Sequence, residues 1–449
     1  MLIVTVLAAS LASVGAAAAE ATCDLELTNA QIWNGAGFDP ATIQVSGNRI
    51  VDMPGVTCRQ HMDLSGQFVS PAFGEGHTHN VEARWNLNSL NQRYQSEGVY
   101  YVQNPVARAT TVAQIIGELE PPEMIDVTFA MGAITSFRGH PEPGYLIYLS
   151  DILYGGANRE DLAGDAFHTV MIEADIPRAL DELERQGADF VKIVLENSSR
   201  YEEVSARVSD DDFWRGLLAD IESGQLTDQE EIDALTDIRL GLNPEFVPQL
   251  VSQAHERGLR VFAHIGNAAD FAVAIHGGVD VIGHMPGAYL AAGEEIEDFR
   301  LDETILRVAA ENRVPVILTA NVRPEFITNE SRNLIYEMQR QNIAAMQEAG
   351  IPVLIGTDRW DAMPSSEVSF LIEQNMLSPS QAFEAWIETG QYIFPQRQIG
   401  CLEAGCEADM LVFPTDPRTS LDAMLNISLR IKQGLVLETE GNQSNTQVD

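Results

Sequence analysis

Positive charge is scarce in this chain. Its 449 residues include 66 Asp and Glu but only 27 Lys and Arg, which gives a formal net charge of -39 at pH 7. Nucleic acids and anionic membrane surfaces are bound by positive patches, so this balance argues against both kinds of partner. We expect the acidic excess mainly to keep the protein soluble, and we expect a small-molecule substrate as its partner. A homo-oligomer is compatible with the sequence, which does not fix the oligomeric state.

Long apolar stretches are also rare, and after the first residues none is long enough to span a bilayer. We therefore expect no stable membrane insertion of the mature chain. Residues 1–19 are apolar and end in a run of small residues, a pattern typical of a secretory signal peptide that is cleaved near Ala19. This segment lacks Lys and Arg, so a retained membrane anchor is the alternative. The prediction is a periplasmic or secreted protein.

Cysteine is sparse too, with Cys23, Cys58, Cys401 and Cys406 as the whole set. An exported protein keeps disulfides, and four cysteines allow three pairings. Residues 403–405 form a turn between the last two cysteines, so we favour Cys401–Cys406 and, with it, Cys23–Cys58. Four unpaired thiols without a role are the alternative. None lies near the histidines described below, so we expect no catalytic cysteine.

The middle of the chain alternates apolar strands with amphipathic helices. Strand candidates lie at residues 68–73, 98–103, 127–130, 190–195, 260–264, 279–282, 314–318 and 351–355. Repeated alternation of this kind predicts a parallel sheet with right-handed crossovers, and eight strands favour a closed α/β fold, the (β/α)8 TIM barrel. Two long connections, at 138–168 and 200–240, follow the third and fourth strands. We interpret them as walls or a lid over a substrate, with surface decoration as the alternative.

Short alternating strands occur at both ends of the chain, with turn residues between them. We predict that both ends build one small β-sandwich domain, from residues 20–66 and 396–440, with the barrel of residues 67–395 inserted between them. The polar residues 441–449 are expected to form a disordered tail.

Five potential metal ligands share one position relative to the predicted strands. His77 and His79 are two residues apart, which puts both side chains on one side of an extended strand. His264, His284 and Asp358 stand at or just after the ends of three later strands. Catalytic residues of such barrels collect at the C-terminal ends of the strands, so this shared placement predicts a metal site there.

Lys192 is the unusual member of this set, because an amine is not a metal ligand in its usual form. It lies among apolar residues on a predicted buried strand, and lysine is seldom buried without a partner. One interpretation is an ion pair with a core carboxylate. We favour a carbamate, since burial lowers the pKa of the amine and makes it nucleophilic toward carbon dioxide. The anionic product would bridge two metal ions.

With these residues in place, the chain resembles the amidohydrolase superfamily over nearly its whole mature length. Residues 63–79, ending in His-Thr-His, look like the segment that leads into the family's first barrel strand. Residues 400–409 are similar to its return to the β domain, and residues 378–383 to its late helix. Ala72 and Glu75 stand where the family usually has Gly and Asp.

The resemblance implies a role for each ligand candidate. His77, His79 and Asp358 would hold the more buried of two divalent ions, and His264 and His284 the other. The ions would be Zn2+ in the first place, with Mn2+, Co2+ or Fe2+ as alternatives, and carboxylated Lys192 would bridge them. A hydroxide between the metals would attack the substrate carbonyl, and Asp358 would move the proton to the leaving group.

Within the superfamily, the chain looks most like the branch of imidazolonepropionase-like proteins and prolidase-like dipeptidases. We therefore predict an exported hydrolase of a carbon–nitrogen bond, with a dipeptide or an N-acyl amino acid as substrate. The alternatives are a lactonase or phosphotriesterase-like esterase on the same site, and a non-catalytic metal-binding barrel. In related dipeptidases the segment after the lysine tends to be rich in Gly, whereas here it is Glu-Asn-Ser-Ser-Arg-Tyr. Candidate substrate-binding residues near the strand ends are His140, Arg200, Tyr201, Arg323 and Arg359.

Overall fold

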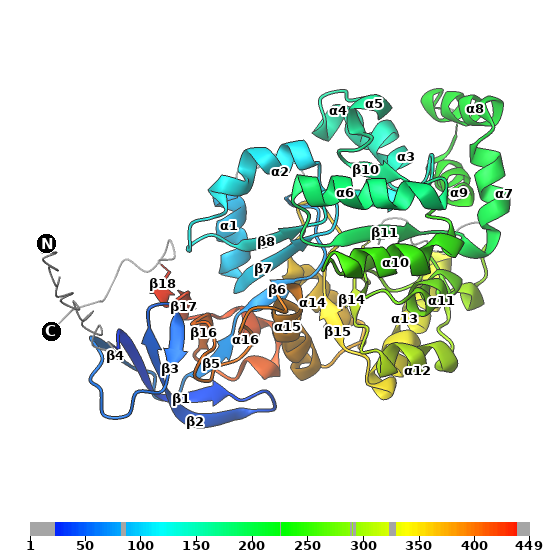
Figure 1. Cartoon of the computed structure of the whole chain (residues 1–449). Coiled ribbons are helices and arrows are strands. Elements are labelled where there is room, and N and C mark those ends of the chain that lie inside the picture. Colours follow the sequence, from blue (N-terminus) through cyan, green and yellow to red (C-terminus); the bar gives the residue numbers. More distant parts are fainter. Residues whose placement is uncertain are drawn as a thin grey trace, which may run out of the picture.

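The structure is a computed structural model that describes residues 23–81, 87–224, 226–287, 290, 293–322 and 329–437 (Figure 1). The predicted signal peptide and the polar tail lie outside these residues. In the part of the chain that is described, no helix has the length and apolar character needed to cross a bilayer.

Strands from both ends of the chain share one sheet of eight strands, drawn at the lower left of Figure 1. Along the sheet the order is β18-β17-β16-β5-β1-β2-β3, and β4 pairs with β1 beside this path. Alternate side chains of β1 and its neighbours are buried in a core of their own, as expected for strands with one covered face. The strands are β1 Leu25–Trp33, β2 Phe38–Ser46, β3 Arg49–Val51, β4 Gln60–Asp63, β5 Phe68–Pro71, β16 Met410–Phe413, β17 Leu429–Lys432 and β18 Leu435–Val436.

The other strands are parallel and form two sheets, one of three strands (β6-β7-β8) and one of seven (β10-β9-β11-β12-β13-β14-β15). Backbone hydrogen bonds also join the last of these strands to the first: Gly76 N donates to Ile355 O at 2.8 Å, and Asp358 N donates to His77 O at 2.7 Å. The strands are β6 Phe73–Glu75, β7 Val99–Asn104, β8 Asp126–Phe129, β9 Ala133–Thr135, β10 Phe167–Thr169, β11 Val191–Leu195, β12 Val261–Ile265, β13 Val281–Ile282, β14 Val316–Leu318 and β15 Val353–Ile355.

Helices alternate with these strands, which confirms a mixed α/β fold with a parallel-sheet domain beside a β-rich domain (Figure 1). In α6 the buried residues Ile176, Ala179, Leu180 and Leu183 recur at helical spacing, and the helix ends at Gly187 with φ 83°. The helices are α1 Leu87–Ser96, α2 Ala109–Ile115, α3 Glu142–Gly144, α4 Ser150–Leu153, α5 Arg159–Leu162, α6 Ile176–Gln186, α7 Tyr201–Val208, α8 Asp211–Glu222, α9 Asp228–Asp237, α10 Val247–Glu256, α11 Ala268–Gly277, α12 Glu303–Glu311, α13 Asn329–Ala349, α14 Pro364–Glu373, α15 Pro379–Ile393 and α16 Leu421–Leu425.

One predicted strand was wrong in its extent. The apolar run 68–73 is two strands, because β5 pairs with β1 and β16 in the β-rich sheet while β6 pairs with β7. The chain changes sheet at Ala72, next to Pro71, which has no N–H to donate to a ladder. Apolar periodicity shows that a strand is buried, but it does not show which sheet the strand joins.

A buried ion-pair network ties the two domains together. The side chain of Lys432 in β17 is fully buried, and its Nζ donates to Asp126 Oδ1 at 2.9 Å and to the carbonyl of Pro122 at 3.1 Å. Arg397 donates to the other oxygen of Asp126 at 2.8 Å. Because Asp126 begins β8, these bonds fix the β-rich sheet against the parallel strands.

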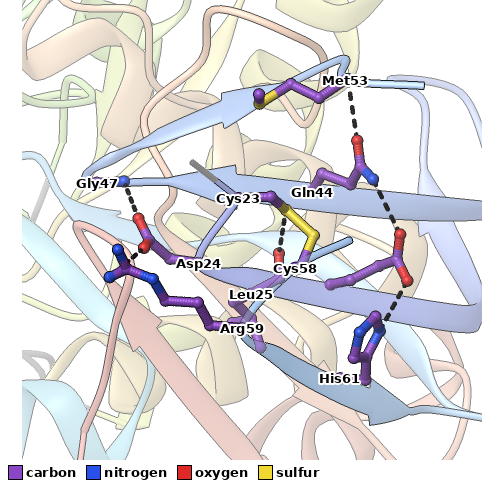
Figure 2. Close-up of a disulfide and its surroundings, with 10 residues drawn as sticks. Cys23, Asp24, Leu25, Gln44, Gly47, Met53, Cys58, Arg59 and His61 are labelled. Atoms are coloured by element: carbon purple, nitrogen blue, oxygen red, sulfur yellow. Dashed lines mark hydrogen bonds and ion pairs between the residues drawn. A yellow bond between two sulfur atoms is a disulfide. The ribbon is translucent and has the colours of Figure 1, made fainter. Parts of the chain in front are cut away.

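Both favoured disulfides are present. Cys23 is bonded to Cys58 and Cys401 to Cys406, and the described residues contain no free cysteine. Figure 2 shows the first disulfide between β1 and the segment before β4, where Arg59 pairs with Asp24 at 3.2 Å. The bond ties the beginning of the described chain to the β-rich sheet.

Candidate metal centre and active site

The six predicted ligands lie together in one cavity of about 470 Å³. His77, His79, His264, His284 and Asp358 come from the C-terminal part of a parallel strand or from the residues just after it, as the strand-end argument predicted, whereas Lys192 is the second residue of β11. Their sources are β6 for His77 and His79, β11 for Lys192, β12 for His264, β13 for His284 and β15 for Asp358.

Asp358 is the centre of the first group of ligands. Its Oδ1 lies 2.9 Å from His77 Nε2 and 2.8 Å from His79 Nε2, and its Oδ2 lies 3.4 Å from His284 Nδ1. One ligand atom from each of His77, His284 and Asp358 falls within a span of 4.8 Å. This set of nitrogen and oxygen donors is of the type that holds a divalent ion.

A second pair of histidines faces inward beside the first group. His264 Nδ1 and His284 Nε2 lie 2.7 Å apart, and the two ring centroids are separated by 4.4 Å. The ring of His284 is also close to that of His77, at 4.6 Å between centroids. The five ligands thus form one contiguous cluster.

The outer nitrogen of His77 is fixed by a hydrogen-bond acceptor. His77 Nδ1 lies 2.8 Å from the carbonyl oxygen of Gly283, which can only accept, so Nδ1 carries the proton. Burial lowers the pKa of His77 to about 4, and the ring is therefore neutral at pH 7. Its Nε2 then presents a lone pair to the Asp358 carboxylate, and two acceptors at hydrogen-bond distance call for a cation between them. Metal-ligating histidines show this arrangement, so the residues fit a metal ion.

Lys192 has the burial expected for the carbamate interpretation and lacks the partner that the ion-pair interpretation requires among the described residues. It is one of only two lysines in the chain, and its side chain is buried. Whereas Lys432 is paired with Asp126, no hydrogen bond or ion pair to Lys192 is found among the described residues; its Nζ lies 4.2 Å from the ring centroid of Phe262. Burial lowers the pKa of Lys192 to about 7, which leaves a large fraction of neutral amine at neutral pH.

Glu75, the residue that departs from the family pattern, connects two of the ligand-bearing segments. Its Oε1 accepts hydrogen bonds from the backbone N–H groups of His77, at 3.1 Å, and Thr357, at 3.0 Å. The side chain is fully buried, and burial raises its pKa well above the ordinary value. Glu75 thereby holds the segment of His77 against that of Asp358.

Two residues of the site were missed from the sequence, Glu196 and Arg239. Glu196 Oε1 lies 2.9 Å from His264 Nε2 and accepts from Arg239 at 3.3 Å. A Cβ on Gly266 would come within 2.1 Å of Glu196 Oε2, so the glycine makes room for this carboxylate. Glu196 could have been identified as a site residue from the polar segment that follows Lys192. No feature of the sequence identified Arg239.

The predicted substrate-binding residues differ in where their side chains lie relative to the cavity. His140 lines the cavity, and its ring stacks on that of His264 at 4.7 Å between centroids. Arg200 pairs with Glu203 and Asp237 at the surface, outside the cavity lining.

Of the remaining three candidates, Tyr201 and Arg359 do not line the cavity either. The Tyr201 hydroxyl is buried and lies 3.0 Å from Ser136 Oγ. Arg359 donates to the carbonyl of Asn321 at 3.3 Å. Arg323 lies outside the described residues. A position near a strand end therefore identifies a loop beside the cavity. It does not show whether a side chain of that loop turns into the cavity.

A comparison with family models matches residues 231–437 to the amidohydrolase family. This match spans just under half of the chain and supports a hydrolase that acts on carbon–nitrogen bonds. The matched residues include His264, His284 and Asp358, and the ligands from β6 and β11 lie upstream of them. No curated protein matches the sequence.

Solved structures show the same fold over nearly the whole chain. An amidohydrolase is similar with a TM-score of 0.65 and 20% identity, and the match covers 92% of this chain and 98% of that one. The ochratoxinase of A. niger has a TM-score of 0.68 at 16% identity, covering 94% and 97% of the two chains. A Xaa-Pro dipeptidase with methionine bound in its active site has a TM-score of 0.63 at 17% identity, covering 92% and 99%.

Proposed function

We propose that this chain is an exported amidohydrolase with two divalent ions, preferably Zn2+, that cleaves the amide bond of a dipeptide or an N-acyl amino acid. One observation carries the proposal: the protonated Nδ1 of His77 donates to a backbone carbonyl, so its bare Nε2 faces the Asp358 carboxylate at 2.9 Å. A divalent ion between these two atoms would satisfy that geometry, which supports the proposal.

The ligands divide into two groups. His77, His79 and Asp358 would hold the first ion, and His264 and His284 the second, with Lys192 as the carboxylated bridge. When bound, such a pair of ions supplies an activated water and polarises the scissile carbonyl. A primary amine is required for the bridge, which accounts for one of the two lysines in a chain whose other basic side chains, Lys432 and the histidines apart, are arginines.

Asp358 would move the proton. Its carboxylate has an exposed fraction of 17%, whereas that of His77 is 1%, so Asp358 reaches the substrate side of the cluster. Its backbone has φ 50°, a left-handed conformation that Asp tolerates. We assign Asp358 Oδ2 as the atom that takes the proton of the attacking water and delivers it to the leaving nitrogen.

The architecture and the location belong to the same proposal. The two parallel sheets would form one closed barrel, which the hydrogen bonds from Gly76 to Ile355 and from Asp358 to His77 support. Export is supported by the apolar residues 1–19 and by two disulfides, because disulfides persist in oxidising compartments.

Hydrolysis of amides is favoured over ester hydrolysis by the similar structures. These structures include a Xaa-Pro dipeptidase, an ochratoxinase and a molinate hydrolase. An activated water is not selective by itself, so lactones and phosphotriesters need to be tested alongside.

The test is a hydrolysis panel with zinc-loaded protein. Dipeptides, N-acyl amino acids, lactones and phosphotriesters are compared, with Asp358→Asn as the inactive reference. We expect amide turnover that Asp358→Asn lowers at least about a hundredfold. Ester or phosphotriester turnover without amide turnover would replace this proposal by an esterase. A protein that binds no metal and turns nothing over would be a non-catalytic barrel.

A further inference from the structure

We propose that the cavity selects N-acyl amino acids with a bulky hydrophobic acyl group, whose carboxylate binds Arg239. This inference rests on the proposed function and narrows its substrate class. It depends on three features: the size of the cavity, the chemistry of its wall and the position of one arginine.

The cavity is larger than a small dipeptide needs. Its volume of about 470 Å³ is within the range of about 300–1,000 Å³ that is typical for sites of drug-sized ligands. A ligand that occupied only the metal end would leave the remainder of an apolar-walled space to water. A larger apolar group would displace that water and gain free energy.

Besides the metal ligands, the cavity wall is mostly apolar, with Glu294 and Asn267 among its polar residues, and it comes in part from the two long connections. Residues 138–168 supply Tyr145 and Leu149, and residues 200–240 supply Leu235 and Ile238. Met285 and Phe299 extend the same surface. An ammonium group of a free dipeptide would lose its hydration against this surface, whereas an uncharged acyl chain would not.

This wall is built before any substrate arrives. Tyr145 packs edge-to-face on Tyr154, with 5.4 Å between the ring centroids, and Ile238 belongs to a buried cluster under the second connection. The two connections also contact each other, because Arg138 donates to the carbonyl of Val208 at 2.9 Å. A preformed apolar wall binds ligands without an ordering cost.

Arg239 provides the group in the cavity that would bind the substrate carboxylate. Among the described residues it is the one arginine that lines the cavity, and its side chain has an exposed fraction of 28% against 6% for its partner Glu196. Glu196 also contacts His264, which places the guanidinium near the metal cluster. Because a guanidinium has five N–H donors, Arg239 has the capacity to bind a substrate carboxylate in addition to Glu196.

The test uses two substrate series, so that the protein itself stays unchanged. In the first, one amino acid carries acyl groups from acetyl to octanoyl, and kcat/KM should rise about threefold per methylene until the cavity is filled. In the second, the carboxylate of the best substrate is replaced by a carboxamide, and kcat/KM should fall at least about tenfold. A change in the substrate is preferable to an Arg239 variant, which would also remove the arginine partner of Glu196.

A matched pair of variants locates the acyl group. Leu149→Asn should reduce the dependence on chain length, whereas Ile152→Asn, at a side chain with an exposed fraction of 77% in the neighbouring α4, should leave it as in the wild type. Calorimetric titration of the metal-free protein with the same acyl series measures the binding preference without turnover.

The outcomes separate the two proposals. Equal kcat/KM across the acyl series, or faster turnover of short free dipeptides, would overturn this inference while amide hydrolysis stands. Chain-length-dependent binding to the metal-free protein, without turnover of any amide by the zinc-loaded protein, would uphold the inference on the ligand and reject the proposed function.

Discussion

Replacing Lys192 by Met should have opposite effects on the metal-free and the metal-loaded protein. The side chain is buried, and burial lowers the pKa of the amine from 10.5 to about 7. At one pKa unit per 1.36 kcal/mol, holding this amine in the apolar interior costs the folded state about 4 kcal/mol at pH 7. Met has a similar length and no charge, and replacing buried charges by apolar groups stabilises proteins by about 1–4 kcal/mol. We therefore expect metal-free Lys192→Met to be more stable than the wild type at pH 7, within that range.

The pH dependence of the free energy of unfolding provides a second test of the Lys192→Met prediction. The folded amine loses its proton near pH 7 and the unfolded amine near pH 10.5, so between these values the unfolded state binds more protons and wild-type stability rises with pH. Lys192→Met lacks this rise, and its advantage should shrink from pH 7 to pH 10. Urea unfolding of chelator-treated protein at several pH values measures both effects. With zinc and bicarbonate present, the variant should bind fewer ions and hydrolyse amides at least about a hundredfold more slowly. A variant that is less stable without metal, yet keeps two ions and full turnover, would refute the reasoning.

Three further predictions concern the surroundings of the site. Glu196→Gln should weaken zinc binding by about 10- to 100-fold, because it removes the carboxylate that orients His264, and equilibrium dialysis would show an unchanged affinity if that role is wrong. At constant dissolved carbon dioxide, carboxylation of Lys192 should fall as pH drops through about 7, since protonation removes the nucleophile; a yield that is the same at pH 6 and pH 8 would contradict this. Asp126→Ala leaves Lys432 buried without its carboxylate, and urea unfolding should show a loss of about 3–5 kcal/mol with unchanged zinc content; a loss below about 1 kcal/mol would mean that the network is not structural.

The ligand set was predictable from the sequence because its position is tied to strand ends. An apolar strand followed directly by His or Asp has few ways to place that side chain, and parallel strands bring their ends to one edge. His264, His284 and Asp358 were found in this way. The disulfide pairing followed from the short loop between Cys401 and Cys406.

The substrate wall was not predictable to the same degree, since loop side chains are oriented by packing between distant segments. Arg200 lies in the predicted connection but turns to Glu203 and Asp237 at the surface. Arg239, from the end of the same connection, lines the cavity instead. The composition also singles out Lys192, because the 449 residues include only two lysines. The sequence analysis did not use this observation.

The scarcity of lysine also gives the most direct test of the central claim, that a buried amine captures carbon dioxide and joins two metal ions. Protein grown with isotope-labelled lysine yields side-chain NMR signals from Lys192 and Lys432 only. On addition of ¹³C-bicarbonate and zinc, we predict one carbamate signal that is coupled to a lysine nitrogen, absent from Lys192→Met, and accompanied by two zinc ions per chain. Two bound ions and full amide hydrolysis with both lysine signals still those of free amines would contradict the account.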